Sequence, residues 1–235
     1  MKILAVDEFN NDGHLIYAEN FPGAYVRGRT REEALNKFPA EITQYCRWAA
    51  LPCREPLDIQ IVTEKPSELK ICDADSDVLF DSERAPLTSD EYIALKALAL
   101  RSAASFQALY DSIPFKDETC LPQRKTFYGD VPRTAEEMYK HTLRVNSYYF
   151  AELDVDAENG PDILSCREAG FAALELQPNY LENRVVRGSY DEEWSLRKLL
   201  RRFIWHDRIH AKAMYRMAVK TFGAEKIANP YYFEV

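Results

Sequence analysis

Residues 200–217 read LRRFIWHDRIHAKAMYRM, and this stretch decides how the C-terminal half of the chain folds. Its apolar side chains recur every three or four residues, which is the period of an amphipathic helix. One stripe of that helix combines large apolar residues with two histidines: Leu199, Phe203, His206, His210, Ala213, Met214 and Met217. Because the apolar stripe of such a helix faces the interior of its domain, we expect both imidazoles to point inward.

Three capping boxes predict where helices begin in this half of the chain. Residues 88–91 (TSDE), 134–137 (TAEE) and 189–192 (SYDE) each place a hydroxyl three residues before a carboxylate. These two side chains can satisfy the free backbone amides of a first helical turn. Including a shorter helix before Pro178, the predicted helices span residues 88–113, 134–153, 161–176 and 189–222. Four consecutive helices predict a four-helix bundle.

The N-terminal part has a shorter apolar period. Residues 2–6, 14–19 and 24–26 are apolar-rich and are separated by turn-forming residues, which predicts a β-meander. A further capping box at residues 30–33 (TREE) predicts a helix that ends near Trp48. Two more strands are predicted, a clear one at residues 59–62 and a weak one at residues 71–80.

The expected fold class is therefore α+β, with a small β-meander and helix followed by an all-α four-helix bundle. The distribution of charge favours a boundary near residue 85, because residues 1–85 carry 10 basic and 16 acidic side chains while the remainder carries 20 and 22. We expect two domains, residues 1–85 and 86–235. The acidic segment 73–83 is expected to be an edge and a linker.

Composition limits the classes of function. The chain has 235 residues and a net charge of -8, so a phosphate backbone would be repelled and nucleic acid is an unfavourable partner. Without a signal-peptide pattern or a long apolar run, we expect a cytoplasmic protein that does not enter a membrane. The five cysteines are an odd number without a C-x-x-C pair, which predicts reduced thiols, with Cys166 a small core residue.

The chemistry of the chain is concentrated in three of its four histidines. His206 and His210 lie four residues apart, so both project from one face of a helix and can meet one metal ion. His141 shares a face of its own helix with Met138 and Tyr148, and we expect it to point inward as well. One divalent cation would satisfy all three imidazoles in a dry interior. Nitrogen donors favour Zn or Ni and also admit Fe, Co or Mn.

The neighbours of these histidines are expected to have plainer roles. Asp207 and Arg208 fall off the inner stripe and are expected to be solvated charges. The same helix contains a short basic run, Arg197, Lys198, Arg201 and Arg202. We expect this run to be an exposed face, and the alternative is that it contacts an anion or a nucleic acid. The H-x3-H pair itself has an alternative, since such pairs also decorate surfaces or form hydrogen-bonded cores.

The helical half resembles the DinB-like bundle family. The resemblance covers about residues 88–222 and rests on the order of four helices, a histidine near the start of the second (TAEEMYKHTL) and H-x3-H in the last (LRRFIWHDRIHAKAMYRM). It implies a metal site at His141, His206 and His210, often within a homodimer. Better understood relatives are transferases or isomerases that depend on a low-molecular-weight thiol, and other relatives have no known activity.

The N-terminal half resembles the HicB-like antitoxin fold. The stretch ENFPGAYVRGRTREEALNKFPAEI, residues 19–42, carries that resemblance. It implies a three-stranded meander and a capped helix, while a separate DNA-binding tail carries out repression in that family. Here a predicted metal bundle takes the place of the tail and residues 1–85 are acidic, so we expect an accessory or dimerising module. His14 is expected to be an exposed strand residue.

The function expected from these observations is that of a metal-dependent enzyme. Three protein ligands leave one coordination position open, as in catalytic zinc sites, where the ion could activate a water molecule or a small thiol. The sequence assigns no separate catalytic acid or base. The alternative is a non-catalytic protein, stabilised by metal, that senses or binds a partner through its N-terminal domain.

Overall fold

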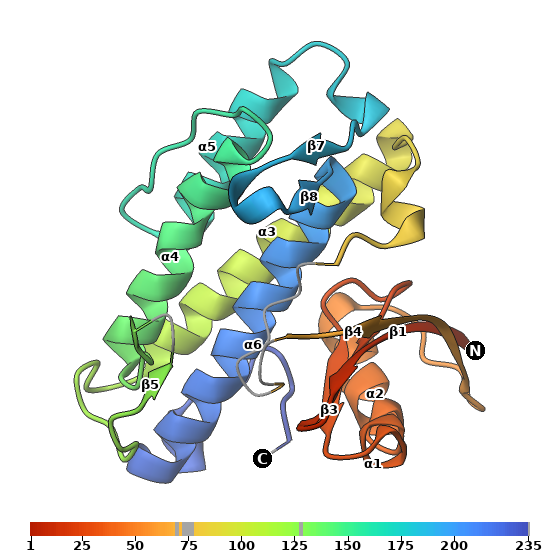
Figure 1. Cartoon of the computed structure of the whole chain (residues 1–235). Helices are drawn as coiled ribbons and strands as arrows, with labels where there is room; N and C mark the ends of the chain where they lie inside the picture. Colours follow the sequence, from red (N-terminus) through yellow and green to blue (C-terminus); the bar gives the residue numbers. More distant parts are fainter. Residues whose placement is uncertain (69–70, 72–77, 127–128, 235) are drawn as a thin grey trace.

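The N-terminal part is a four-stranded sheet in the order β3-β2-β1-β4 (Figure 1). Strands β1 (Lys2–Asn10), β2 (Gly13–Ala18) and β3 (Tyr25–Gly28) form an antiparallel meander, as the turn signals predict. Strand β4 (Asp58–Pro66) pairs parallel with β1. The structure is a computed structural model, and it describes residues 1–68, 71, 78–126 and 129–234.

Two short helices stand where one was predicted. Helix α1 (Arg31–Leu35) has Thr30 as its N-cap, and α2 (Phe38–Ala49) follows after a break. Pro39 accounts for the break, because it has no amide hydrogen to donate to the carbonyl oxygen of Leu35 in a continuous helix. At the first turn of a new helix the same residue is well tolerated.

The weak strand predicted at residues 71–80 lies mostly outside the described residues, since 72–77 are not described. The described residues Val78 and Phe80 at its end are buried and are not part of a strand. A short 3-10 turn, η1 (Asp81–Arg84), follows them and precedes the helical part. The division into domains at residue 85 stays a prediction.

Four long helices make up the C-terminal part: α3 (Ser89–Ser112), α4 (Ala135–Ala151), α5 (Ile163–Glu175) and α6 (Leu196–Phe222). Thr88 and Thr134 form complete capping boxes at the starts of α3 and α4, as predicted. Helix α6 packs against α3 and α4, and α5 packs against the same two helices. The chain is thus a mixed α+β protein, as its periodicity predicts.

The predicted start of the last helix is wrong. Helix α6 begins at Leu196 with Ser195 as its N-cap, not at residue 189. The preceding residues form a hairpin of β7 (Val186–Arg187) and β8 (Glu193–Trp194). Tyr190 and Asp191 lie in the loop of that hairpin with φ of 58° and 62°. A left-handed backbone at these two positions is incompatible with the first turn of a helix.

The N-terminal sheet packs against the side of α6 that faces away from α4 and α5 (Figure 1). Trp205 of α6 contacts the rings of Tyr17 and Tyr25, which project from the sheet. Gly23, with φ of 90°, brings the turn before β3 so close to α6 that an added Cβ would lie 2.4 Å from the Ile204 side chain. Glycine is therefore required here by close approach as well as by backbone conformation.

Buried charge also connects the two parts of the chain. Arg208 of α6 donates hydrogen bonds to the carboxylate of Glu41 on α2, at 2.7 Å, and to the carbonyl oxygen of Gly23, at 3.2 Å. Both side chains of the ion pair are nearly inaccessible, with exposures of 1% and 3%. Helix α6 is thus enclosed by helices on one side and by the N-terminal part on the other. Across the described residues, no helix has the length and apolar character that crossing a membrane requires.

Candidate metal centre

Three histidines from α4 and α6 converge in space. The potential ligand nitrogens of His141, His206 and His210 all lie within 4.8 Å of one another. Their ring centroids are 5.1 Å apart for His141 and His206, 4.5 Å for His141 and His210, and 4.4 Å for His206 and His210. Nitrogens that share a tetrahedral zinc ion at about 2.1 Å are about 3.4 Å apart. The observed separations exceed that spacing by at most about 1.4 Å, so the three side chains lie close enough to bind one metal ion.

Burial keeps two of these imidazoles neutral. His206 is 5% exposed, and its pKa lies well below the usual value because of burial first and the neighbouring histidines second. Burial, together with His141 and Arg27, lowers the pKa of His210 to about 3. A neutral imidazole offers a lone pair to a metal, whereas a protonated one does not. Both side chains are therefore in the ligand-competent form at neutral pH.

One nitrogen of the group has no hydrogen-bond partner. Nδ1 of His206 is buried and receives or donates no hydrogen bond among the described residues. A buried polar atom without a partner costs about 1 to 3 kcal/mol relative to a satisfied one. Coordination of a cation by this imidazole is one way to remove that cost.

The site lies at the edge of the helical interior, not in its centre as predicted. His206 is buried, but His141 and His210 are only partly so. The predicted stripes are each partly wrong: Tyr148 on α4 is half-buried, and Ala213 on α6 is exposed. The fully buried face of α4 instead contains Met138, Tyr139, Thr142, Asn146, Tyr149 and Phe150. One side of the histidine cluster is consequently accessible from solvent.

Asp207 and Arg208 are buried, which corrects the expectation that they are solvated. Asp207 accepts two hydrogen bonds of 3.2 Å from the guanidinium of Arg167 on α5. The side chains of Asp207 and Arg167 are 0% exposed, and that of Arg208 is 1% exposed. Burial raises the pKa of the Asp207 carboxyl while the Arg167 guanidinium opposes the shift. The two residues after His206 thus form buried ion pairs on different faces of α6, Asp207 with α5 and Arg208 with α2.

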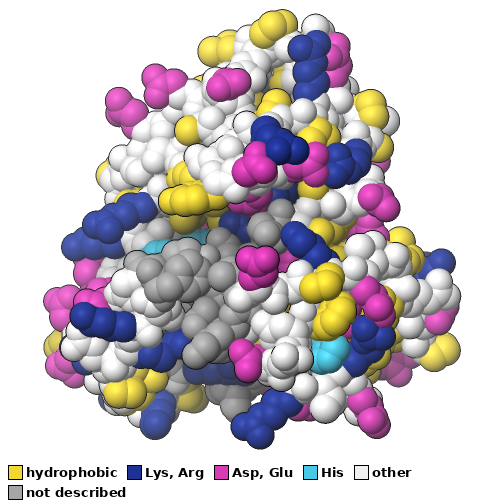
Figure 2. All heavy atoms as spheres, viewed as in Figure 1, with side chains coloured by type: hydrophobic (Ala, Val, Ile, Leu, Met, Phe, Trp, Pro, Cys, Tyr) yellow, Lys and Arg dark blue, Asp and Glu magenta, His cyan; other side chains and the backbone are white. Residues whose placement is uncertain are grey.

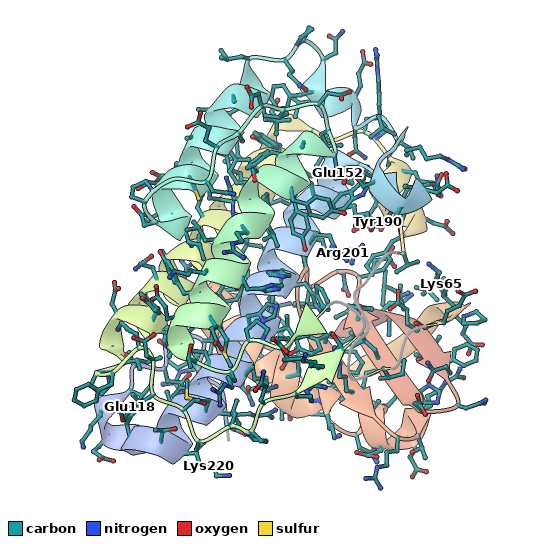
Figure 3. The ribbon with its side chains drawn as sticks, turned by 60° about the vertical axis from the view of Figure 1, so that its left-hand side comes forward. Lys65, Glu118, Glu152, Tyr190, Arg201 and Lys220 are labelled. Atoms are coloured by element: carbon teal, nitrogen blue, oxygen red, sulfur yellow. The ribbon has the colours of Figure 1, made fainter. Side chains whose placement is uncertain are left out.

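Three of the four residues of the basic run on α6 are buried and Arg197 is 17% exposed and paired with Glu91, so the predicted exposed face is wrong. Lys198, Arg201 and Arg202 are 0%, 3% and 2% exposed. Lys198 pairs with Glu192 at 2.7 Å, and burial lowers its pKa to about 8. Figure 3 shows Arg201 among the side chains between α6 and the N-terminal part, where it pairs with Glu83. A nucleic acid therefore cannot reach this run in the folded chain.

Two further predictions have opposite outcomes. His14 was expected to be exposed, yet its side chain is only 18% exposed and its Nδ1 lies 3.0 Å from the carboxylate of the buried Asp7. Cys166 is buried in α5, as expected. The described cysteines are free thiols, while Cys72 lies outside the described residues.

A pocket of about 470 Å³ reaches the histidine cluster. Its walls come from Gln123, from residues 130–133 and from the exposed side of α4, and they include His141. Three basic residues, Arg133, Lys140 and Arg144, also line it, and the sequence analysis did not single them out. Arg144 follows His141 by three residues, a spacing that places two side chains on the same helix face and so contained the signal.

Comparisons of the chain with protein-family models, with curated proteins and with solved structures gave no match. The chemistry of the histidine cluster is therefore inferred from its own geometry.

Proposed function

We propose that His141, His206 and His210 bind one divalent metal ion, Zn or Ni in the first place, as the centre of a metal-dependent enzyme. The observation that carries the proposal is the convergence of three imidazoles from two distant segments, with an orphaned Nδ1 on the most buried of them. Three nitrogen donors suit these ions better than Mg or Ca, which prefer oxygen ligands.

An open coordination position supports catalysis over a purely structural role. Within the described ranges, the cluster contains no fourth His, Cys, Asp or Glu side chain. Asp207, the nearest carboxylate in sequence, is held by Arg167. Structural zinc sites have four protein ligands, whereas catalytic sites have three and an exchangeable position. The pocket beside His141 gives that position a route to solvent.

A metal ion held by these histidines would supply a nucleophile at neutral pH, because it would lower the pKa of a bound water or thiol into the physiological range. The protein holds the ligands in place. Helix α6 is packed on all sides around His206, and the Tyr149 ring lies edge-on to that imidazole at 6.0 Å. We infer hydrolysis or thiol transfer as the reaction class, with a water or a low-molecular-weight thiol at the open position.

The arrangement of α3 to α6 and the order of the histidines support placing the helical part in the DinB-like family, and the meander supports a HicB-like N-terminal part. We also propose, from the same resemblance, that the enzyme works as a homodimer. The N-terminal part would then be an accessory module, because its sheet packs on α6 next to the metal ligands.

The second candidate function is a metal-stabilised binding or sensor protein. It is favoured by the position of the ligands, since an ion held by His141 and His206 would connect α4 to the central helix α6. In this case the ion contributes folding free energy and the N-terminal part binds a partner. Chelation would then lower the melting temperature strongly without abolishing any activity.

Elemental analysis of the purified protein tests the metal site. We expect about one equivalent of a divalent metal per chain, and a drop of at least about tenfold in His206→Ala, because two ligands rarely hold an ion that three hold. The matched control is His14→Ala, since His14 is the fourth histidine and lies outside the cluster. Equal metal content in both variants would contradict the proposal.

The cobalt-substituted protein distinguishes the two candidate functions. Its visible spectrum should change when a small thiol is added, because the open position accepts an exogenous ligand. An unchanged spectrum at saturating thiol would favour the structural role.

A further inference from the structure

The pocket beside His141 has a definite charge. Its lining side chains include three bases, Arg133, Lys140 and Arg144, and two acids, Asp130 and Glu137, so their net charge is +1. A bound divalent ion would add to that positive charge. The volume of about 470 Å³ lies within the range of small-molecule sites. The pocket therefore fits a small anionic molecule.

Both acids of the pocket are engaged in local structure. The Glu137 carboxylate accepts hydrogen bonds from the backbone amides of Arg133, at 2.8 Å, and Thr134, at 3.1 Å, and these bonds lower its pKa. Asp130 lies 3.8 Å from the ammonium group of Lys125. Both carboxylates thus have partners other than Arg144.

The bases differ in how far they are already paired. Lys140 forms an ion pair with Glu136 at 2.8 Å, and the Arg133 guanidinium lies 3.5 Å from the carbonyl oxygen of Leu121. The exposed Arg144 side chain has no hydrogen bond and no ion pair among the described residues. Its planar guanidinium can therefore offer two parallel N–H donors to an incoming oxyanion.

Arg144 also lies on the same side of α4 as the metal ligand. His141 and Arg144 are three residues apart, and side chains with that spacing are neighbours on a helix surface, about 5 to 6 Å apart at Cβ. Figure 2 shows Lys and Arg side chains next to a histidine on the side of the molecule where α4 lies. A molecule of a few carbon atoms can span the distance between the two groups.

We propose that the substrate of this centre is a small monocarboxylate, whose carboxylate pairs with Arg144 while its reacting group enters the open metal position. This inference rests on the proposed metal site. A carboxylate fits this arrangement because it needs one counter-charge, and Arg144 supplies one while the metal position is taken by the reacting group. Arg144 is thus a substrate-binding residue that sets specificity.

A matched pair of thiols tests this assignment on the cobalt-substituted protein. The probes are 3-mercaptopropionate and 3-mercapto-1-propanol, which have the same length and differ in the carboxylate. Binding is followed by the thiolate-to-cobalt absorption band. We expect 3-mercaptopropionate to bind about tenfold more tightly, the factor that about 1.4 kcal/mol represents. Arg144→Gln should remove this preference and leave the affinity for 3-mercapto-1-propanol unchanged.

The control variant is Arg184→Gln, which removes another exposed arginine, 74% accessible, at a site outside this pocket. It should keep the tenfold preference. Equal affinities for the two thiols, or a preference that survives in Arg144→Gln, would overturn the carboxylate assignment while the metal site stands. Failure of the unmutated protein to bind cobalt would overturn the metal site and this inference together. Melting curves of both variants should match that of the unmutated protein, since both side chains are exposed.

Discussion

The ion pair between Glu41 and Arg208 should be among the most sensitive points of the fold. Both side chains are buried, and they connect α2 to the central helix α6. Glu41→Gln leaves the Arg208 guanidinium buried without its counter-charge. Removing one partner of such a pair costs about 3 to 5 kcal/mol, a large part of the roughly 5 to 15 kcal/mol that stabilises a typical domain.

Urea unfolding followed by circular dichroism measures this loss. The control is Glu182→Gln, which breaks an ion pair with Arg184 whose side chains are 49% and 74% exposed. Exposed pairs contribute about 0 to 1 kcal/mol, so this variant should unfold close to the unmutated protein. Glu41→Leu combined with Arg208→Met should be less destabilised than Glu41→Gln, because the buried guanidinium is removed and only the partly exposed Lys212 ammonium loses its contact with Glu41. A loss below about 1 kcal/mol in Glu41→Gln would refute the reasoning from burial.

The remaining predictions concern two other features of the fold. Gly23→Ala should destabilise the protein by about 1 to 3 kcal/mol, since the new Cβ would lie 2.4 Å from Ile204, and thermal unfolding measures the effect. Gly129→Ala, also at positive φ but with no atom within 4 Å, should cost less, and equal losses would contradict the close-approach argument. Burial lowers the pKa of Lys198 from 10.5 to about 8. Between pH 8 and 10.5 this side chain is therefore protonated in the unfolded chain and mostly neutral in the folded one. Stability should therefore rise with pH through this window, and Lys198→Met, which cannot titrate, should reduce the rise in urea unfolding series.

Local signals in the sequence predicted where most elements lie. The capping boxes at Thr88 and Thr134 depend only on side chains within one turn, and both are present in the structure. The box that begins at Ser189 contains the same residue types, but its backbone is committed to a hairpin loop. Pairing of Val186 with Trp194 decides that outcome, and such pairing is not visible in a four-residue motif.

The histidine cluster could be predicted because each of its parts has a periodic signal. His206 and His210 follow the apolar stripe of α6, and His141 is close to the apolar face of α4. The burial around them could not be predicted. The apolar period of a helix predicts a single buried face, whereas α6 has a second buried face that packs against the N-terminal part.

The partners of the charged residues on α6 explain that failure in physical terms. Arg201 pairs with Glu83 and Arg208 with Glu41, and both carboxylates are more than 100 residues away in sequence. A charge next to a distant counter-charge can be buried, but no window of neighbouring residues contains the information. The sequence pattern therefore assigned these residues to solvent.

Enclosure of residues 198–208 of α6 has a consequence for how this protein can vary. Every position from Lys198 to Arg208 is buried, so almost any substitution there disturbs a packed neighbour or an ion pair. An inserted residue would rotate everything after it by about 100° around the axis and separate the metal ligands from His141. We therefore expect sequence variation to be concentrated on the solvent-exposed faces of α3 and α5 and to be low in this central segment.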